Sequence, residues 1–299
     1  MIPENDAPST PSTISAHDDC ESDNEDLTCP LSPKSMNDLA DHNVRVNDLV
    51  INASQQLLKH QFTNVTGLVD TLVVAACKMD ISDLSESTAI QIIFDSVRKH
   101  WLTVTNQDCL PGHINIYCSL QLIPSPQCVE TICRLFKFQT RSLTLDVLNT
   151  HRQTGTVDCG LFAVAYADML ARKQDPCNAI FDQSRMRAHL SRCLKNQNME
   201  TFPLKLNRSP RRRVIRTKTE TLFCCCRSMY TAGDPMIQCD QCSEWYHQQC
   251  LVIDDNVFEQ YSQQSVNYKC PKCSYATAEN SKGTQNFSLL PSLLIIAIN

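Results

Sequence analysis

Cysteine and histidine residues gather in closely spaced pairs between residues 224 and 273. Thiolate sulfur and imidazole nitrogen are the ligands that structural zinc prefers, and a pair a few positions apart can hold one ion from a tight turn. Four pairs within 50 residues argue against ordinary buried cysteines and suffice for two tetrahedral sites. The sequence therefore predicts two structural zinc ions, held by Cys224, Cys226, Cys239, Cys242, His247, Cys250, Cys270 and Cys273. Cys225 is left over, and we expect its side chain to point away from the metal.

The order of these ligands, with His in fifth place, and the string WYHQQC at 245–250 resemble the PHD finger. A RING finger, which would indicate a ubiquitin ligase, usually has His in fourth place and lacks the preceding Trp. The resemblance implies a cross-brace: the first and third ligand pairs bind one ion, and the second and fourth pairs bind the other. One difference is Tyr268, where many members of the family have Trp.

The same resemblance implies a histone tail as partner. In members that bind methylated lysine, an aromatic cage holds the ammonium group, and Trp245 matches one wall of that cage. Met236 and Tyr230 are further candidates for the cage, and Asp234 and Asp240 are candidates to pair with basic residues of the tail. The alternative is that Trp245 only packs the small core of the finger.

A second group of chemically active residues lies in the middle of the chain. It consists of His100-Trp101, the string IYCSL at 116–120 and the string QTGTVDCG at 153–160. In this order they resemble the Ulp-type proteases, papain-like cysteine peptidases of the SUMO-specific kind. The segment VNDLVINASQQLL at 46–58 resembles the substrate-groove segment of that family. The resemblance implies a papain-like fold over residues 44–204 and a ubiquitin-like, SUMO-like protein as partner.

The resemblance also assigns roles. Cys159 would be the nucleophile, at the start of a predicted helix whose dipole and free N–H groups favour a thiolate. His100 would act as general base and then as general acid. Gln153 would stabilise the oxyanion. Trp101 would cover the narrow tunnel for the Gly-Gly tail of the substrate.

Two positions depart from the family. Its third catalytic residue is an Asp, and here that position is Cys118, which cannot stabilise an imidazolium as a carboxylate does. Asn115 is expected on the opposite strand face, and Asp108 lies in a preceding loop. Arg45 stands where many members have a tunnel Trp. Two functions therefore stay open: an attenuated peptidase, or a non-catalytic chromatin adaptor that binds histone tails and a ubiquitin-like protein.

The elements that must position these residues follow from apolar periodicity. It predicts helices over 48–60, 128–136, 160–171 and 181–194, and strands over 101–105, 114–120 and 143–148. This mixture indicates an α+β domain, followed by the small cross-brace zinc finger at 222–275. Polar composition predicts disordered tails at 1–40, which is acidic, and at 276–299, and a basic linker at 205–220.

Composition bounds the location. The chain carries 18 Cys but opens without an apolar signal region, so the cysteines outside the finger are expected to be reduced thiols. The apolar run Leu289–Ile298 is far shorter than the roughly 20 residues of a membrane-spanning helix, so no membrane association is expected. The basic linker is interpreted as a nuclear import signal or a solvated hinge, and as the one segment for contact with nucleic acid. We expect the protein in the nucleus.

Overall fold

The computed structural model describes residues 31–76, 84–205, 213–263 and 266–274. The predicted tail at 276–299 and the first 30 residues of the predicted tail at 1–40 lie outside these ranges. Within them, no helix combines the length and the apolar character that crossing a membrane requires.

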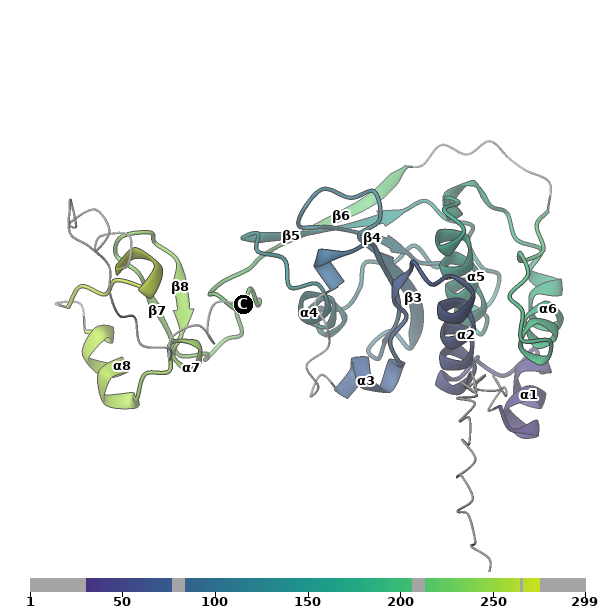
Figure 1. Cartoon of the computed structure of the whole chain (residues 1–299), viewed down its shortest axis with the longest axis horizontal. Helices are drawn as coiled ribbons and strands as arrows, with labels where there is room; N and C mark the ends of the chain where they lie inside the picture. The colour runs from purple at the N-terminus through teal and green to yellow at the C-terminus, as the bar shows by residue number, and fades with distance from the viewer. Residues whose placement is uncertain (1–30, 77–83, 206–212, 264–265, 275–299) are drawn as a thin grey trace, which may run out of the picture.

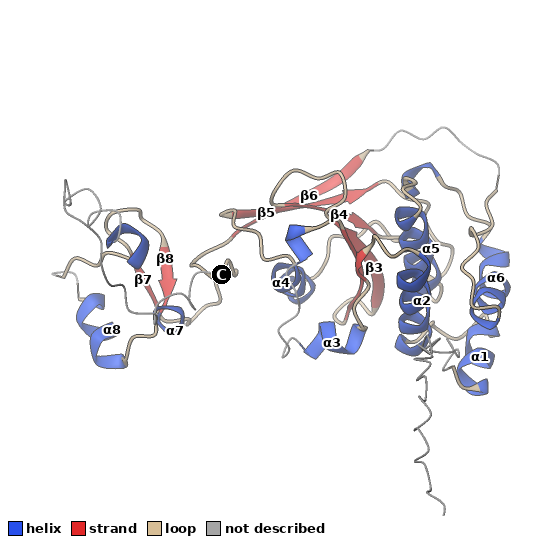
Figure 2. Cartoon of the chain, viewed as in Figure 1, coloured by secondary structure: helices blue, strands red, loops and turns tan. Residues whose placement is uncertain are grey.

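The larger domain is built on a mixed six-stranded sheet with its strands in chain order (Figure 2). Strands β1 and β2 are parallel, as are β4 and β5, and the other neighbours are antiparallel. The strands are β1 Thr66–Gly67, β2 Ala89–Asp95, β3 His100–Thr105, β4 His113–Tyr117, β5 Ser142–Leu148 and β6 Val214–Thr221.

Helices cover both faces of this sheet (Figure 1). They are α1 Pro33–Ala40, α2 Asp48–Gln61, α3 Thr71–Ala76, α4 Pro126–Leu135, α5 Cys159–Ala171 and α6 Gln183–Lys195, with 3₁₀ turns at Leu84–Glu86 and Pro176–Asn178. One core joins α2, α5 and α6 to one face, and a second joins α4 to the other. Along β2, Ile92 enters the first core and Ile93 the second. All residues of α5 are buried, because apolar side chains surround this helix on every face. The α+β class predicted from the sequence is confirmed.

The ordered domain begins earlier than the sequence suggested. Residues 33–40, assigned to a disordered tail, form α1. The side chain of Ser32 caps this helix by accepting the Ser35 N–H at 3.2 Å, and Pro33 occupies the first turn, where its missing N–H costs nothing. Leu39 is buried against the core. The buried Leu39 and the Ser32 cap anchor this segment, and neither can be recognised from its polar composition.

The second half of the predicted linker is a strand. Residues Val214–Thr221 form β6 at the edge of the sheet, antiparallel to β5 in the register Ser142↔Thr221. Its alternation of β-branched and charged residues suits an exposed edge, and charges there discourage pairing with other chains. Of the three consecutive arginines at 211–213, Arg213 belongs to the described residues and the other two lie outside them.

The small finger follows β6. It contains β7 Met236–Gln238 paired with β8 Trp245–His247, and the short helices α7 Gln248–Leu251 and α8 Asp255–Ser262. Leu222 and Met229 pack against the second core of the large domain. The Arg141 Nε atom lies 2.8 Å from Oε2 of the buried Glu244. Strand, apolar contact and ion pair thus join the finger to the edge of the sheet.

Candidate peptidase centre and zinc centres

The eight predicted zinc ligands form two clusters of four. One contains Cys224, Cys226, His247 and Cys250, the other Cys239, Cys242, Cys270 and Cys273, and within each cluster the ligand atoms lie within 4.8 Å of one another. The sulfur atoms of Cys242 and Cys270 are 3.9 Å apart. Four sulfurs around a tetrahedral zinc at about 2.3 Å lie roughly 3.8 Å from each other. The residues therefore fit two zinc ions, and the expected cross-brace pairing is confirmed.

Neighbouring side chains hold these ligands in place. His247 turns its Nδ1 toward Cys226, 3.4 Å away, while its Nε2 lies 4.0 Å from the Asp234 carboxylate. This distance exceeds that of a hydrogen bond, so Asp234 is near the outer nitrogen of the histidine without bonding it directly. Glu244 accepts the Cys224 N–H at 3.2 Å. Cys225 is exposed and lies outside both clusters.

The β7–β8 hairpin separates core residues from surface residues. Ile237 and Tyr246 face each other inward, whereas Trp245 lies opposite Gln238 and is 39% exposed. Because strand positions two apart share a face, Met236 is on the same face as Trp245. Tyr230 is also exposed. Asp240 is engaged within the finger, where its carboxylate accepts the Tyr268 N–H at 2.7 Å.

Three of the candidate peptidase residues lie at the ends of three elements. His100 opens β3, Cys118 follows the end of β4, and Cys159 opens α5. The sulfur of Cys118 lies 3.3 Å from His100 Nε2 in a fully buried contact. That leaves Nδ1 as the nitrogen of His100 that can serve Cys159. Among the described residues, no hydrogen bond joins Cys159 to His100 directly.

Burial shifts both members of the pair toward their neutral forms. It lowers the pKa of His100 to about 4, despite the Asp95 carboxylate, which raises this pKa, and the Arg45 guanidinium lowers it further. Burial also raises the pKa of Cys159, although the Trp101 N–H, Arg45 and the Gly160 N–H oppose this. Near neutral pH burial therefore favours a neutral thiol and a neutral imidazole, whereas the position of Cys159 at a helix start led us to expect a thiolate.

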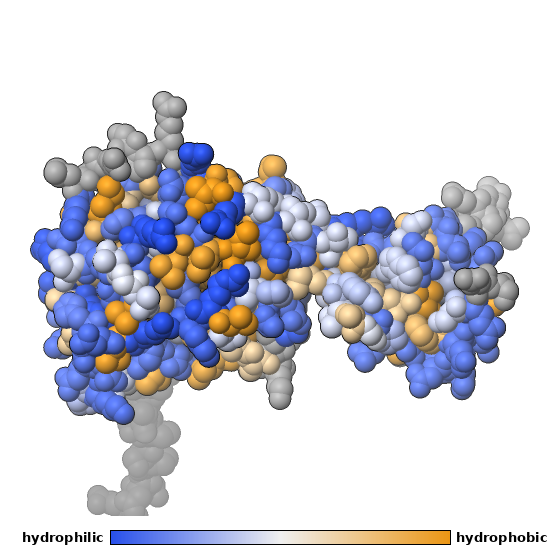
Figure 3. Space-filling model, turned by 180° about the vertical axis from the view of Figure 1, so that it is seen from behind, coloured by the Kyte–Doolittle hydropathy of each residue, from blue (hydrophilic) through white to orange (hydrophobic). Residues whose placement is uncertain are grey.

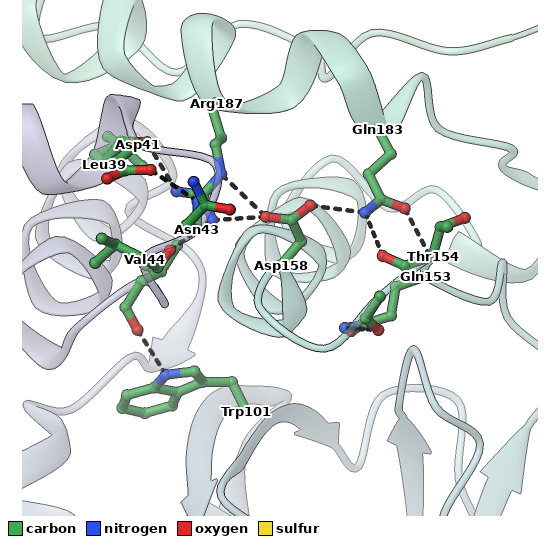
Figure 4. Close-up of polar contacts among 12 residues, drawn as sticks. Leu39, Asp41, Asn43, Val44, Trp101, Gln153, Thr154, Asp158, Gln183 and Arg187 are labelled. Atoms are coloured by element: carbon green, nitrogen blue, oxygen red, sulfur yellow. Dashed lines mark hydrogen bonds and ion pairs between the residues drawn. The ribbon is translucent and has the colours of Figure 1, made fainter.

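A buried polar network fixes the loop in front of Cys159 (Figure 4). Arg187 of α6 donates to Asp158 Oδ1 from Nε and Nη2, at 3.0 and 2.7 Å, and to the carbonyls of Leu39 and Val44. Gln183 donates to the other Asp158 oxygen at 2.6 Å. Sequence reasoning did not single out Arg187. The sequence offers Asp158, next to Cys159, as the indication of such a residue, because a buried carboxylate needs a cationic partner.

The cover over Cys159 is tight. Trp101 donates its indole N–H to the Val46 carbonyl at 3.0 Å (Figure 4), and Phe94 packs on its ring at 4.8 Å between centroids. A Cβ built on Gly160 would lie 2.7 Å from the Val46 Cβ, so only glycine permits this approach. Arg45, one residue earlier, donates to the Lys99 carbonyl at 2.6 Å, beside His100.

Gln153 lies in the loop between β5 and α5 and is tied to the end of β4. Its backbone N–H bonds the Ser119 carbonyl at 3.0 Å, and its side-chain oxygen accepts the Ser119 hydroxyl. Its amide nitrogen donates to the Gly155 carbonyl at 3.1 Å. The donor predicted for an oxyanion is therefore present and, in this conformation, bonded to its own loop.

A third ligand-type cluster consists of His189 and Cys193 of α6 and of Glu200, which follows this helix. Both ring nitrogens of His189 have partners, the Glu200 carbonyl at 3.0 Å and the Arg192 guanidinium at 3.1 Å. The guanidinium also pairs with the Glu200 carboxylate at 3.1 Å. The Arg192 guanidinium already binds both His189 and Glu200, so we interpret this cluster as a hydrogen-bonded network and not as a metal site.

The PHD-finger family model matches residues 224–273, the segment that carries the two clusters. This segment is a PHD finger. Three curated proteins are similar to it. The chromatin remodeling protein SHL of Arabidopsis thaliana is 35% identical over 70 residues, 22% of this chain and 28% of that protein. The PHD finger protein ALFIN-LIKE 1 of Oryza sativa is 41% identical over 56 residues, 19% and 20% of the two chains.

The lysine-specific demethylase 7B of Danio rerio is 36% identical over 55 residues, 18% of this chain and 9% of that protein. The chain therefore spans less than a third of the length of these relatives.

Solved structures resemble the larger domain. One is the C-terminal Ulp1 protease domain in complex with Smt3, the yeast ortholog of SUMO, at 14% identity and a TM-score of 0.44, covering 55% of this chain and 82% of that one. Another is described as a de-sumoylating protease, at 13% identity and a TM-score of 0.41, covering 56% and 86%. At this level the likeness adds no argument about activity, which has to come from the residues themselves.

Proposed function

We propose that the chain is a cysteine peptidase of restricted activity that acts on a SUMO-like ubiquitin-like protein, as a conjugate or a precursor, and that its PHD finger binds a histone tail. The peptidase proposal rests on the arrangement around the start of α5. Cys159 is the first residue of this helix, the His100 ring contacts the Cys118 sulfur, and Val46 packs on Gly160. Because Val46 packs directly on Gly160, an opening formed there when Val46 moves would suit a substrate tail that has no side chains, such as Gly-Gly.

The chemistry requires a proton transfer before or during attack. His100 Nδ1 takes the Cys159 S–H proton, and the sulfur adds to the carbonyl carbon of the last glycine. The oxygen that gains negative charge is stabilised by N–H groups at the start of α5 and by the Gln153 amide, once it turns from the Gly155 carbonyl. The protonated His100 then gives its proton to the leaving amine, and water releases the acyl group.

Two features restrict this reaction. The Cys159 side chain is 1% exposed, so the segment that holds Arg45 and Val46 has to move when a substrate enters. Among the described residues no carboxylate is hydrogen-bonded to the His100 ring, because Cys118 contacts Nε2 and burial raises the pKa of that thiol. We therefore expect a slow enzyme.

The direct test uses a SUMO-type protein that carries a C-terminal vinyl sulfone. The full chain should form a covalent adduct through Cys159, and Cys159→Ala should form none. Because the pKa of Cys159 is raised and that of His100 is low, the labelling rate should keep rising from pH 6 to pH 9, without the plateau near pH 7 that an ion pair gives. The measurement is the rate of the adduct's mobility shift across pH.

The competing function is a chromatin adaptor that has kept the fold as a binding surface. The burial of Cys159 and the lack of a carboxylate at position 118 favour the adaptor. Binding of the unmodified SUMO-type protein, with no adduct from the vinyl sulfone at any pH in that range, would establish the adaptor and exclude the peptidase.

For the PHD finger, the hairpin face shared by the exposed Trp245 and the half-buried Met236 supports a cage for a methylated lysine, since buried Tyr246 already fills the core. The relatives whose names place them in chromatin remodeling or lysine demethylation support a chromatin location. We therefore place the chain in the nucleus.

Changing Trp245 to Ala should weaken binding of a trimethylated-lysine histone peptide about tenfold, because a cation–π contact contributes roughly 1–2 kcal/mol. Binding of the unmodified peptide should change little. Calorimetry with both peptides measures the difference, and a zinc content unchanged from the unaltered chain shows that the finger is intact. Val252→Ala, a change at an exposed apolar residue outside the β7–β8 hairpin, is the control and should leave both affinities unchanged. Equal loss for both peptides in Trp245→Ala would contradict the cage.

A further inference from the structure

The hairpin between β2 and β3 places a carboxylate opposite the candidate base. Asp95, the last residue of β2, pairs in register with His100, the first residue of β3. Residues directly opposite each other in an antiparallel pair have their side chains on the same face, with Cβ atoms about 5 Å apart. Both side chains therefore belong to the face that also carries Cys118.

The carboxylate of Asp95 is buried and firmly held. Its side chain is 1% exposed, Oδ2 accepts the Ser125 N–H at 2.7 Å, and Oδ1 accepts the Arg98 N–H at 3.1 Å. Burial raises the pKa of this carboxyl, but the bonds from Ser125 and Arg98 outweigh it, so the net shift is downward and Asp95 is ionised near neutral pH.

The other groups around His100 lack this charge. Cys118, from the end of β4, is a neutral thiol at neutral pH, since burial raises its pKa. Arg45, from the segment before α2, carries a positive charge and opposes protonation of the ring. Cys159, from α5, is neutral until it gives up its proton. Of the described groups that act on His100, Asp95 supplies the negative charge.

We propose that Asp95 is a positioning residue that takes over, across the hairpin, the electrostatic part of the role that the carboxylate missing at position 118 would have. It stabilises the imidazolium formed when His100 accepts the Cys159 proton, while Cys118 keeps the Nε2 side of the ring occupied. The catalytic consequence rests on the proposed peptidase. The charge pairing itself does not.

The first test follows the ring resonances of His100 by NMR through a pH titration of the full chain. Asp95→Asn keeps an oxygen for the Ser125 N–H but removes the charge, so the midpoint of His100 should move to lower pH. In the vinyl sulfone assay, the same variant should label about fivefold more slowly, as expected when an opposite charge that acts on His100 is removed. A midpoint that stays or rises in a folded Asp95→Asn protein would overturn the proposal.

A second pair of variants covers the case in which Asp95→Asn does not fold. Arg98→Met removes the exposed guanidinium that pairs with Asp95 at 3.4 Å. Its positive charge then no longer offsets the effect of the Asp95 carboxylate on the pKa of His100. Lys99→Met removes a positive charge from the same turn without touching Asp95. The His100 midpoint should rise more in Arg98→Met than in Lys99→Met, and an equal or smaller rise would overturn the proposal.

The activity of double variants separates this role from a merely structural one. In a Cys118→Asp background, Asp95→Asn should cost less activity than in the natural chain, because the new carboxylate already stabilises the imidazolium. A purely structural role of Asp95 predicts the same loss in both backgrounds. If the probe never labels any variant, the peptidase is excluded, whereas the NMR shifts still decide the charge pairing.

Discussion

Removing zinc from the full chain is expected to unfold the PHD finger and leave the larger domain folded. The finger's buried cluster consists of four zinc-ligand cysteines with Ile237, Tyr246 and Tyr268, which is too small a core to hold 50 residues by itself. Binding of structural zinc contributes on the order of 10–16 kcal/mol, and in so small a module that free energy is the folding free energy. The larger domain has two extensive cores without a zinc ligand.

The measurement is zinc content together with hydrogen exchange followed by mass spectrometry. The untreated chain should contain two zinc ions, and a strong chelator should remove protection from residues 236–273 but not from α5. Cys239→Ser should lower the zinc content and the protection of the finger, whereas Cys225→Ser, the matched change at an exposed thiol, should leave two ions. A finger that stays protected without zinc would contradict this account.

How far the sequence determines each part depends on how local the information is. The zinc ligands were predictable, down to their pairing, because each pair is a few residues long and the family resemblance supplies the cross-brace. The helices and strands that carry His100 and Cys159 were predictable because their apolar periodicity reflects which face is buried. Helix α1 and strand β6 were missed, since a polar segment can be ordered by partners distant in the chain.

The peptidase centre depended on such distant partners. The contacts of Arg187 with Asp158 and with the carbonyls of Leu39 and Val44 cannot be predicted from residue spacing. They join segments that are far apart in the sequence. Asp95 could not be found for the same reason: its position opposite His100 depends on strand register, which apolar periodicity does not give. The pKa shifts likewise come from burial, which periodicity indicates only coarsely.

Replacing Cys118 by Asp is expected to raise the rate of labelling and cleavage of a SUMO-type substrate by at least about tenfold, or roughly 1.4 kcal/mol of barrier. The new carboxylate would take the place of a sulfur that lies 3.3 Å from His100 Nε2, so it would orient the ring and stabilise the imidazolium. Since it would raise the pKa of His100 and thereby favour the thiolate of Cys159, the pH dependence of labelling should move toward lower pH.

The surroundings of Cys118 are suited to such a charge. Its sulfur already accepts the Leu122 N–H at 3.4 Å, and the N–H groups of Leu120 and Gln121 also lower the pKa of this thiol. The Leu122 N–H could donate to a carboxylate in the same place, and the neighbouring N–H groups would also favour its charge, which offsets part of the cost of burying it.

Two isosteric or smaller replacements serve as controls. Cys118→Asn offers the cradle an oxygen without the charge, and Cys118→Ala removes the side chain, so neither should gain activity. The comparison requires equal thermal stability and equal alkylation of Cys159 in the unfolded chains, which establishes equal amounts of usable protein. If Cys118→Asp folds and Cys159 reacts with a small alkylator, yet the SUMO-type substrate is untouched, then the obstacle is substrate entry beneath Arg45 and Val46. The adaptor would then be the function of this domain, because a competent catalytic pair without a passage for the substrate tail cannot act as a peptidase.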